Sequence, residues 1–111
     1  MLTKTKPIRS QKLRDSAEGE DCTLNIEGAC NYDPSTTVLC HLPDDSGTGK
    51  MGGKSCDATC TVYGCSGCHD YLDRRTKRSL EHEIEGIMDI LYFARVRTLR
   101  RMIEKGLIKI A

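Results

Sequence analysis

The chain has 111 residues, of which 38% are hydrophobic, with a single Phe and no Trp, so its core must come mostly from aliphatic side chains. A domain of this size buries only about 60–70% of its unfolded surface, so a cross-link or a bound metal adds useful stability. The formal net charge of +1 excludes a polycation that binds nucleic acid through bulk charge, and leaves only local basic patches for such a contact.

The seven cysteines are an odd number, which does not favour a secreted disulfide framework. The first fourteen residues are basic but lack the apolar segment of a signal peptide, and no run approaches the roughly 18 apolar residues of a membrane span. We therefore expect a cytoplasmic protein without a membrane partner, whose thiols are reduced.

The N-terminal segment is basic and contains no acidic residue before position 15; its cations are Lys4, Lys6, Arg9, Lys12 and Arg14. Two interpretations stay open, a solvated terminus and a basic arm that rests on phosphates. A short helix is predicted over residues 10–17, with Ser10 as its cap. We assign residues 1–20 to this arm, as the first part of a single domain that spans 1–111.

Three short strands are predicted in the middle of the chain. Leu24 and Ile26 alternate with polar residues within the segment 21–30, and β-branched residues favour a strand over 36–41. A third strand over 59–63 is expected to return antiparallel to the second. The sequence thus predicts a small sheet within residues 21–76.

A glycine-rich segment, DDSGTGKMGGKS, follows Pro43. Its glycines do not have the spacing of a phosphate-binding P-loop, so we expect a flexible loop and no nucleotide site. Lys50 and Lys54 in this loop are candidate contacts to a nucleic-acid backbone.

The segment Gly64–Arg75, GCSGCHDYLDRR, carries the densest chemistry. Its two cysteines, Cys65 and Cys68, can bind one Zn²⁺, and tetrahedral zinc needs two more ligands. Cys22 and Cys30 supply such a pair, so we predict a four-cysteine structural zinc site. Three alternatives stay open: His69 replaces Cys22 or Cys30; Cys56 and Cys60 compete for the metal; or the cysteines are ordinary thiols.

Two helices are predicted after the second cysteine pair, a short one over 69–75 and a long one over 79–105. The long one has apolar residues near the 3.6-residue period: Leu80, Ile84, Ile87, Met88, Leu91, Ala94, Leu99, Met102 and Ile103. A helix of that length is about 40 Å long. Because so small a domain cannot bury it entirely, we expect residues 77–111 to offer a surface for a homodimer.

This order of parts, a strand ending in His41, a loop, a strand, a cysteine pair and a helix that opens with His69, resembles the HNH or ββα-metal nuclease finger. The pieces CTLNIEGACN, TTVLCH and CSGCHDYLDRR are further similar to a family of phage and prophage nucleases typified by YbcO. That similarity covers about residues 14 to 75, and it is most specific at CSGCHD.

The resemblance implies that His41 activates water and that the helix supplies a ligand to a catalytic divalent metal. An imidazole suits proton abstraction near neutral pH, and a cation neutralises charge on the phosphate in the transition state. On a helix, Asp73 lies four residues after His69 on the same face. The further candidate ligands are Asp70 and Asp57, and the candidate phosphate contacts are Arg74 and Arg75.

One residue departs from the wider HNH pattern, because Cys40 stands where many such enzymes carry an acidic metal ligand just before the histidine. A thiolate is a poor ligand for Mg²⁺. Either Asp57 fills this role, or the catalytic metal is softer, or this branch is weakly active.

The sequence therefore predicts a small α+β protein, an HNH-like ββα-metal finger stapled by zinc and followed by a long C-terminal helix. The predicted function is a metal-dependent endonuclease that acts on nucleic acid, DNA above all, with structural Zn²⁺ and catalytic Mg²⁺, Mn²⁺ or another divalent cation. The alternatives are a non-catalytic zinc module that binds DNA or a protein, and a redox switch that uses Cys65 and Cys68.

Overall fold

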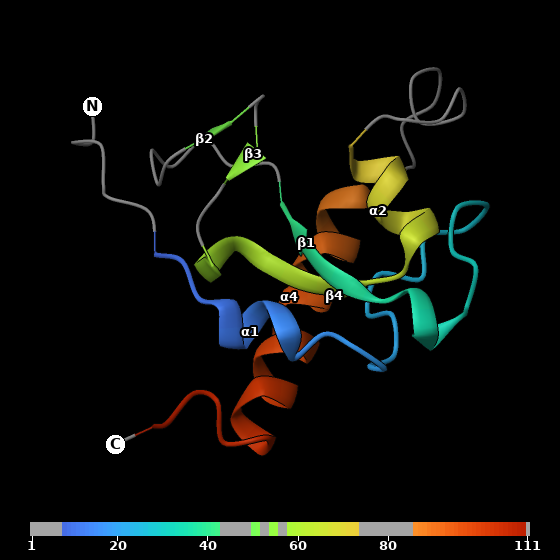
Figure 1. The fold of residues 1–111 in the computed structure, drawn as a ribbon. Coiled ribbons are helices and arrows are strands. Elements are labelled where there is room, and N and C mark those ends of the chain that lie inside the picture. Colours follow the sequence, from blue (N-terminus) through green and yellow to red (C-terminus); the bar gives the residue numbers. More distant parts are fainter. Residues whose placement is uncertain (1–7, 43–49, 52–53, 56–57, 74–85, 111) are drawn as a thin grey trace, which may run out of the picture.

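The computed structural model describes residues 8–42, 50–51, 54–55, 58–73 and 86–110. A two-stranded antiparallel sheet at the centre packs against helices, and a second short antiparallel sheet lies to one side, so the fold is a small α+β fold, as predicted (Figure 1). The elements in chain order are α1 (Gln11–Asp15), η1 (Pro34–Thr36), β1 (Val38–His41), β2 (Lys50–Met51), β3 (Lys54–Ser55), η2 (Ala58–Cys60), β4 (Thr61–Gly64), α2 (Ser66–Leu72) and α4 (Ile87–Glu104).

The strands β1 and β4 pair antiparallel at the centre of the molecule, which confirms the predicted pairing with slightly shifted ends. Cys40 lies opposite Val62, and Leu39 lies opposite Tyr63. Because successive side chains of a strand point to opposite faces, each of these pairs belongs to one face of the sheet. We call them the Cys40 face and the Leu39 face.

The Cys40 face is covered by α2, by the segment 22–30 and by the start of α4. The core here comprises Leu24, Ile26, Cys40, Val62, Cys65, Cys68, Tyr71, Leu72, Leu91 and Ala94. Three cysteines belong to this core, and Cys22 and Cys30 pack against it. Sulfur thus supplies part of the apolar volume that aromatic residues would otherwise fill.

The segment 22–30 is not a strand, and the prediction of one there was wrong. Asn25 has a left-handed backbone with φ of 46°, and the amides of Ala29 and Cys30 both donate to the carbonyl oxygen of Ile26. These turns bring Cys30 back toward Cys22, although Leu24 and Ile26 are buried as the alternation required.

The Leu39 face is covered by α1 and by the C-terminal part of α4, around Leu39, Tyr63, Ala17 and Met102. The helix α1 is shorter than the predicted 10–17, and Ser10 caps it as predicted, since its hydroxyl accepts from the amide of Leu13 at 3.2 Å.

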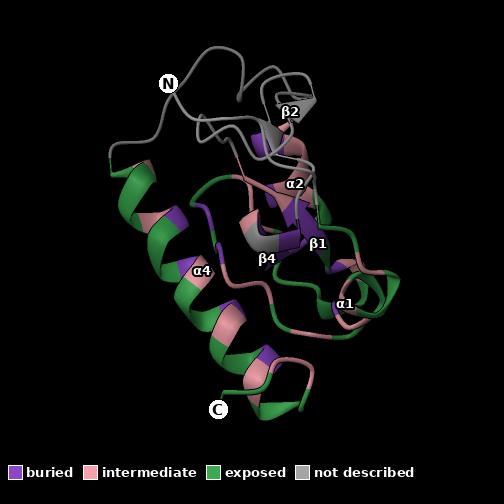
Figure 2. Ribbon diagram, turned by 90° about the vertical axis from the view of Figure 1, so that its left-hand side faces the viewer, coloured by how far each residue is buried: buried purple, intermediate pink, exposed green. Residues whose placement is uncertain are grey.

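The long helix α4 is confirmed over Ile87–Glu104, whereas the predicted start at 79–85 lies outside the described residues. Its buried positions are Leu91, Ala94, Thr98 and Met102. In Figure 2 the buried, purple parts of α4 lie on the side of the helix that faces the sheet. The predicted apolar stripe was wrong at Met88, which is 72% exposed. A homodimer through this helix stays a prediction.

Polar side chains of α4 close the outer edge of β4. The amide of Tyr63 donates to the hydroxyl of Thr98 at 3.0 Å, and a guanidinium nitrogen of Arg95 donates to the carbonyl oxygen of Thr61 at 2.7 Å. Unpaired edge groups would otherwise need water or another strand. The helix thus takes the place of a third strand, which explains why a buried threonine interrupts its apolar face.

Four residues of the glycine-rich segment are described, and they lie in short strands and not in the loop predicted there. Lys50 pairs with Ser55 and Met51 pairs with Lys54 in the hairpin β2–β3. Among the described residues, no helix combines the length and the apolar character that crossing a bilayer requires.

Candidate metal centre and histidine hollow

The structure brings the two predicted cysteine pairs together. The sulfurs of Cys22, Cys30, Cys65 and Cys68 all lie within 4.8 Å of one another. Cys22 and Cys68 share an S···S contact of 3.7 Å, and Cys30 and Cys65 share another of 3.7 Å. Within the described part of the chain, this is the group of three or more His, Cys, Asp or Glu side chains whose ligand atoms lie close enough to hold a metal ion, and His69 is not a member of it.

The spacing of these sulfurs fits a tetrahedral cation. Each sulfur of a zinc–tetrathiolate site lies about 2.3 Å from the metal, so two sulfurs are about 3.8 Å apart. The contacts between the two pairs match that edge length. The four side chains can therefore enclose one metal ion without a further ligand.

Backbone amides point at the sulfurs and complete their surroundings. Each of five amides donates to a cysteine sulfur at 3.4 Å: Asn25 to Cys22, Ile26 to Cys68, Asn31 to Cys65, Tyr32 to Cys30 and Cys68 to Cys65. Such bonds stabilise negative charge on a thiolate and fix its orientation toward a metal. Left-handed backbone at Asn25 and Tyr32, with φ of 46° and 55°, turns two of these amides inward.

Hydrogen bonds and burial shift the pKa values of three thiols of the cluster. The hydrogen bond with Cys68 lowers the pKa of Cys22 to about 4. Burial raises the pKa of Cys30 to about 11. The bond to Cys22 and burial also raise the pKa of Cys68. Since the thiolate is the ligand form, a metal ion would displace the protons that these pairs hold.

The second cysteine pair lies in the first turn of α2. The prediction of a separate cysteine knuckle before a helix that starts at His69 was therefore wrong. Cys65 is the N-cap, and its sulfur accepts from the amide of Cys68. Between them, Gly67 packs directly on the backbone of Ala29, and a Cβ atom at this position would collide with the Ala29 carbonyl oxygen. The absence of a side chain at Gly67 is what lets the two cysteine-bearing segments meet.

His69 follows on α2 and lies between two carboxylates. Its Nε2 is 3.3 Å from an oxygen of Asp73, and its Nδ1 is 3.7 Å from an oxygen of Asp70. The two acids therefore face opposite nitrogens of the ring. Of these three residues, His69 and Asp73 are the pair that can direct their ligand atoms toward one cation.

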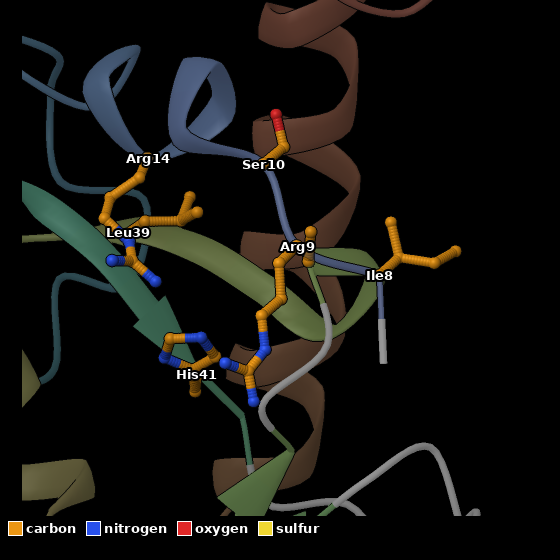
Figure 3. Close-up of a pocket in the computed structure, with 7 residues that line it drawn as sticks. Ile8, Arg9, Ser10, Arg14, Leu39 and His41 are labelled. Carbon is orange, nitrogen blue, oxygen red and sulfur yellow. The ribbon is translucent and has the colours of Figure 1, made fainter. Parts of the chain in front are cut away.

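His41 ends β1 and lines a hollow on the Leu39 face (Figure 3). The hollow is bounded by β1, by the segment that leads into α1 and by η2; its lining residues are Ile8, Arg9, Ser10, Arg14, Leu39, His41 and Ala58. Cys40, in contrast, is fully buried in the core on the other face. The residue before the histidine therefore points away from the hollow, and Cys40 cannot ligate a metal beside His41.

The two groups of candidate catalytic residues lie on different faces of the β1–β4 sheet. Leu39 and His41 share one face, while Tyr71 and Leu72 anchor α2 against the Cys40 face. The structure thus brings His69 and Asp73 together, but it does not bring them into the hollow of His41.

The structure describes only some of the remaining predicted site residues. Asp57, Arg74 and Arg75 lie outside the described residues, as does Cys56. Lys50 and Lys54 lie in β2 and β3, across the short sheet from Ser55 and Met51 respectively. Cys60 closes η2 on the histidine side of the molecule, where its carbonyl oxygen accepts from the amide of Leu42.

Sequence reasoning missed three contributors to these sites. Gly67 could have been noticed as a glycine between two cysteines. Its role depends on a contact with Ala29, which is far away in the sequence. Arg9 and Arg14 were recognised as basic, but their position beside His41 follows from how the N-terminal segment packs on β1.

Comparison with known proteins places the chain in a family. Residues 11–106 match the family described as "Putative nuclease YbcO". The match covers most of the sequence, and the chain therefore belongs to the YbcO family, as its sequence resemblance predicted.

Two curated relatives carry the same description, one from Escherichia coli K-12 and one from Enterobacteria phage 82. Each is 44% identical over 64 residues, which are 58% of this chain and 65% of the relative. The alignment thus spans a little under two thirds of the length of these relatives. A solved structure described as a putative bacteriophage protein from E. coli K-12 substr. MG1655 superposes with a TM-score of 0.62 at 27% identity, covering 86% of this chain and all of the other (100%).

Proposed function

We propose that this protein is a metal-dependent endonuclease that hydrolyses phosphodiester bonds in DNA, in the cytoplasm and in a phage or prophage context. The family description supports a nuclease. The observation that carries the proposal is the imidazole of His41 at the end of β1, lining a hollow that also presents two guanidinium groups.

The metal at the four cysteines is zinc in this proposal, and its role is structural. Four sulfur ligands suit zinc better than Mg²⁺ or Ca²⁺, which prefer oxygen. A site with four protein ligands has no open position for water or substrate, unlike a catalytic zinc site. Zinc here would hold α2 and the segment 22–30 against β1 and β4.

His41 is the general base of the proposal. An imidazole has an ordinary pKa of about 6.5, so a useful fraction is neutral and can accept a proton from water at physiological pH. Its position at the end of β1, with Leu42 bonded to Cys60 immediately after it, fixes the backbone on both sides. The side chain would take the proton of the attacking water beside a bound phosphate.

His69 and Asp73 are the proposed ligands for the catalytic divalent cation. Ligand atoms 3.3 Å apart can both lie about 2.1 Å from one cation, and water or phosphate oxygens would complete its coordination. Such a cation supplies neutralisation of negative charge on the phosphate during hydrolysis. Asp70, on the other side of the ring, would orient the imidazole through Nδ1.

A non-catalytic zinc module that binds DNA is the second candidate, and one observation favours it. His41 and α2 lie on opposite faces of the β1–β4 sheet, whereas a water-activating base and its cation should flank the same phosphate. In this alternative the cysteines and the basic residues keep their roles, and His41 has none.

Nicking of supercoiled plasmid by zinc-loaded protein, with Mg²⁺, Mn²⁺ or Ni²⁺ added, tests the proposal. We expect metal-dependent nicking that falls by at least about 100-fold in His41→Ala, the usual scale of general acid–base catalysis. Zinc content and circular dichroism should be unchanged in the variant. His82→Ala, which removes the chain's remaining histidine apart from His69, is the matched control and should keep full activity.

Each other outcome has a defined meaning. Equal activity in His41→Ala would remove the histidine from the chemistry. Protein that is folded, binds DNA and nicks with none of the three metals would establish the binding module instead. His69→Ala should raise the metal concentration needed for half-maximal nicking, and an unchanged requirement would remove the cation from α2.

A further inference from the structure

The hollow around His41 is rich in positive charge. Arg9 and Arg14 both line it, and Figure 3 shows their guanidinium groups turned toward the histidine from either side. None of the lining residues that the structure describes is acidic, and neither arginine forms an ion pair with a described carboxylate. The composition is that of an anion site: two forked cations and an imidazole around one opening.

The backbone that carries these arginines is held in place. The amide of Ala58 donates to the carbonyl oxygen of Ile8 at 2.7 Å, which ties the segment before Arg9 to η2. Ser10 caps α1 directly after Arg9. Arg14 then lies on α1 one residue after Leu13, which packs against the cluster of Leu39 and Tyr63. Both guanidinium groups thus extend from backbone that is anchored beside β1.

An arginine recognises phosphate through a planar fork of N–H donors, which can bind two phosphate oxygens at once. Two such forks on either side of a strand-end imidazole leave a position for a single tetrahedral anion between them. We propose that Arg9 and Arg14 bind a backbone phosphate of the nucleic acid and position it against His41. The proposal rests on the nuclease function above, and it assigns the substrate contact to the N-terminal segment.

The sequence could not decide between a solvated terminus and a basic arm. In the structure, Arg9, just before α1, and Arg14, on α1, both line the hollow, whereas Lys12, also on α1, does not line it. Lys12 therefore provides a control of equal charge, a few residues from either arginine.

Binding of a labelled DNA duplex at several NaCl concentrations measures the phosphate contacts directly. Each neutralised phosphate contributes about 0.9 to the slope of log affinity against log salt. We expect the Arg9→Gln/Arg14→Gln double variant to lower the slope by about 0.9, the contribution of the one phosphate, and each single variant to lower it by part of that amount. Lys12→Gln should leave it nearly unchanged. Equal effects of all three substitutions would overturn the proposed phosphate site, because they would show that only the total positive charge affects binding.

A conservative variant separates a forked contact from simple charge. Arg14→Lys keeps the charge but loses the fork, so it should restore the salt slope while nicking stays several-fold below wild type. Full recovery of nicking would overturn the positioning role. Circular dichroism and zinc content establish that each variant is folded.

The binding assay keeps this inference distinct from the proposed function. If no metal supports nicking, the salt slopes still test the arginines as a phosphate site. If wild-type protein nicks DNA and the double arginine variant nicks equally well at the same KM, the inference fails while the nuclease stands. If His41→Ala keeps its activity, the general base is located elsewhere. The effect of the arginine substitutions on the salt slope of DNA binding would still test the phosphate site.

Discussion

Gly67 decides how closely the two halves of the metal centre approach. It lies between Cys65 and Cys68 in the first turn of α2, in contact with the backbone of Ala29. An alanine in a helix is normally more stable than a glycine by about 0.5–1 kcal/mol. At this position the packing contact opposes that gain, because the added methyl group meets main-chain atoms that belong to the segment between Cys22 and Cys30.

Gly67→Ala should therefore destabilise the protein by about 1–3 kcal/mol, as overpacking does elsewhere, and should weaken metal binding. Thermal unfolding and competition with a chromogenic chelator measure the two effects. Lys12→Ala, an exposed change on α1, should alter neither. A Gly67→Ala protein that is more stable than wild type would mean that helix propensity prevails and that Ala29 yields easily.

The cysteine ligands were predictable because a metal site needs a fixed number of residues of one type, and two pairs were available. The amides that donate to the sulfurs were not predictable. They depend on left-handed backbone at Asn25 and Tyr32, which no sequence pattern indicated. His41 was recognised at the end of its strand. The arginines beside it were not assigned there, because their partners come from distant parts of the chain.

At the scale of elements, α4 is held at both ends by different means. Its N-terminal half packs on the Cys40 face through Leu91 and Ala94, and its C-terminal half also binds the turn after α1 through charge. Arg101 and Lys105 donate to the two carboxylate oxygens of Glu20, at 2.8 Å and 3.0 Å. The side chain of Glu20 is only 14% exposed, so screening by solvent is reduced.

This ion network makes stability depend on pH. Burial raises the pKa of Glu20, but the hydrogen bonds from Arg101 and Lys105 outweigh it, so the pKa lies below its ordinary value of 4.5. A group with a lowered pKa stabilises the fold above that ordinary value, and the contribution is lost as pH falls through the folded-state pKa.

We expect Glu20→Gln to lower the urea midpoint at pH 7, and we expect its difference from wild type to shrink as the pH falls below 4.5, because wild type then loses the same contribution. Urea titrations from pH 7 to pH 3 measure the difference between the two proteins. Glu18→Gln, an exposed change two residues away, is the control and should follow wild type throughout. A gap between wild type and Glu20→Gln that stays constant with pH would exclude the carboxylate charge as its cause.

Hydrophobic periodicity located α4 but did not give its contact face correctly. Thr98 is fully buried and Met88 is exposed, the reverse of what apolar spacing suggests. The reason is the edge of β4 that does not pair with β1. The amide of Tyr63 at this edge donates to the hydroxyl of Thr98, and an apolar side chain could not accept that hydrogen bond. The shift of α2 toward the N-terminus has a similar cause, since Cys65 acts as its cap as well as a sulfur donor.

At the scale of the whole molecule, the sulfur cluster joins segments that are far apart in sequence, and it adjoins the larger of the two cores. The fold should therefore depend on the metal. Apparent binding free energies for structural zinc are roughly 10–16 kcal/mol in small zinc peptides, which exceeds the total stability of many domains of this size.

Cys68→Ser, or a strong chelator, should abolish the cooperative melting transition of the metal-loaded protein, because it removes one sulfur and the ion together. Circular dichroism at increasing temperature, beside metal analysis, provides the measurement. Cys60→Ser is the control, since Cys60 is not among the four clustered sulfurs, and it should retain both metal and transition. A melting curve for Cys68→Ser identical to that of wild type would exclude a metal ion that stabilises the fold at the four cysteines.

The division of β1 between two faces has a consequence for how its gene can change. Cys40 points into the sulfur-rich core, and His41, one residue later, lines the arginine hollow. Deleting or inserting a single codon within this strand would exchange the two, driving an imidazole among the thiols and exposing a thiol between the guanidinium groups. Length changes here would therefore damage folding and chemistry in one event, whereas point substitutions at either residue can affect one of them alone.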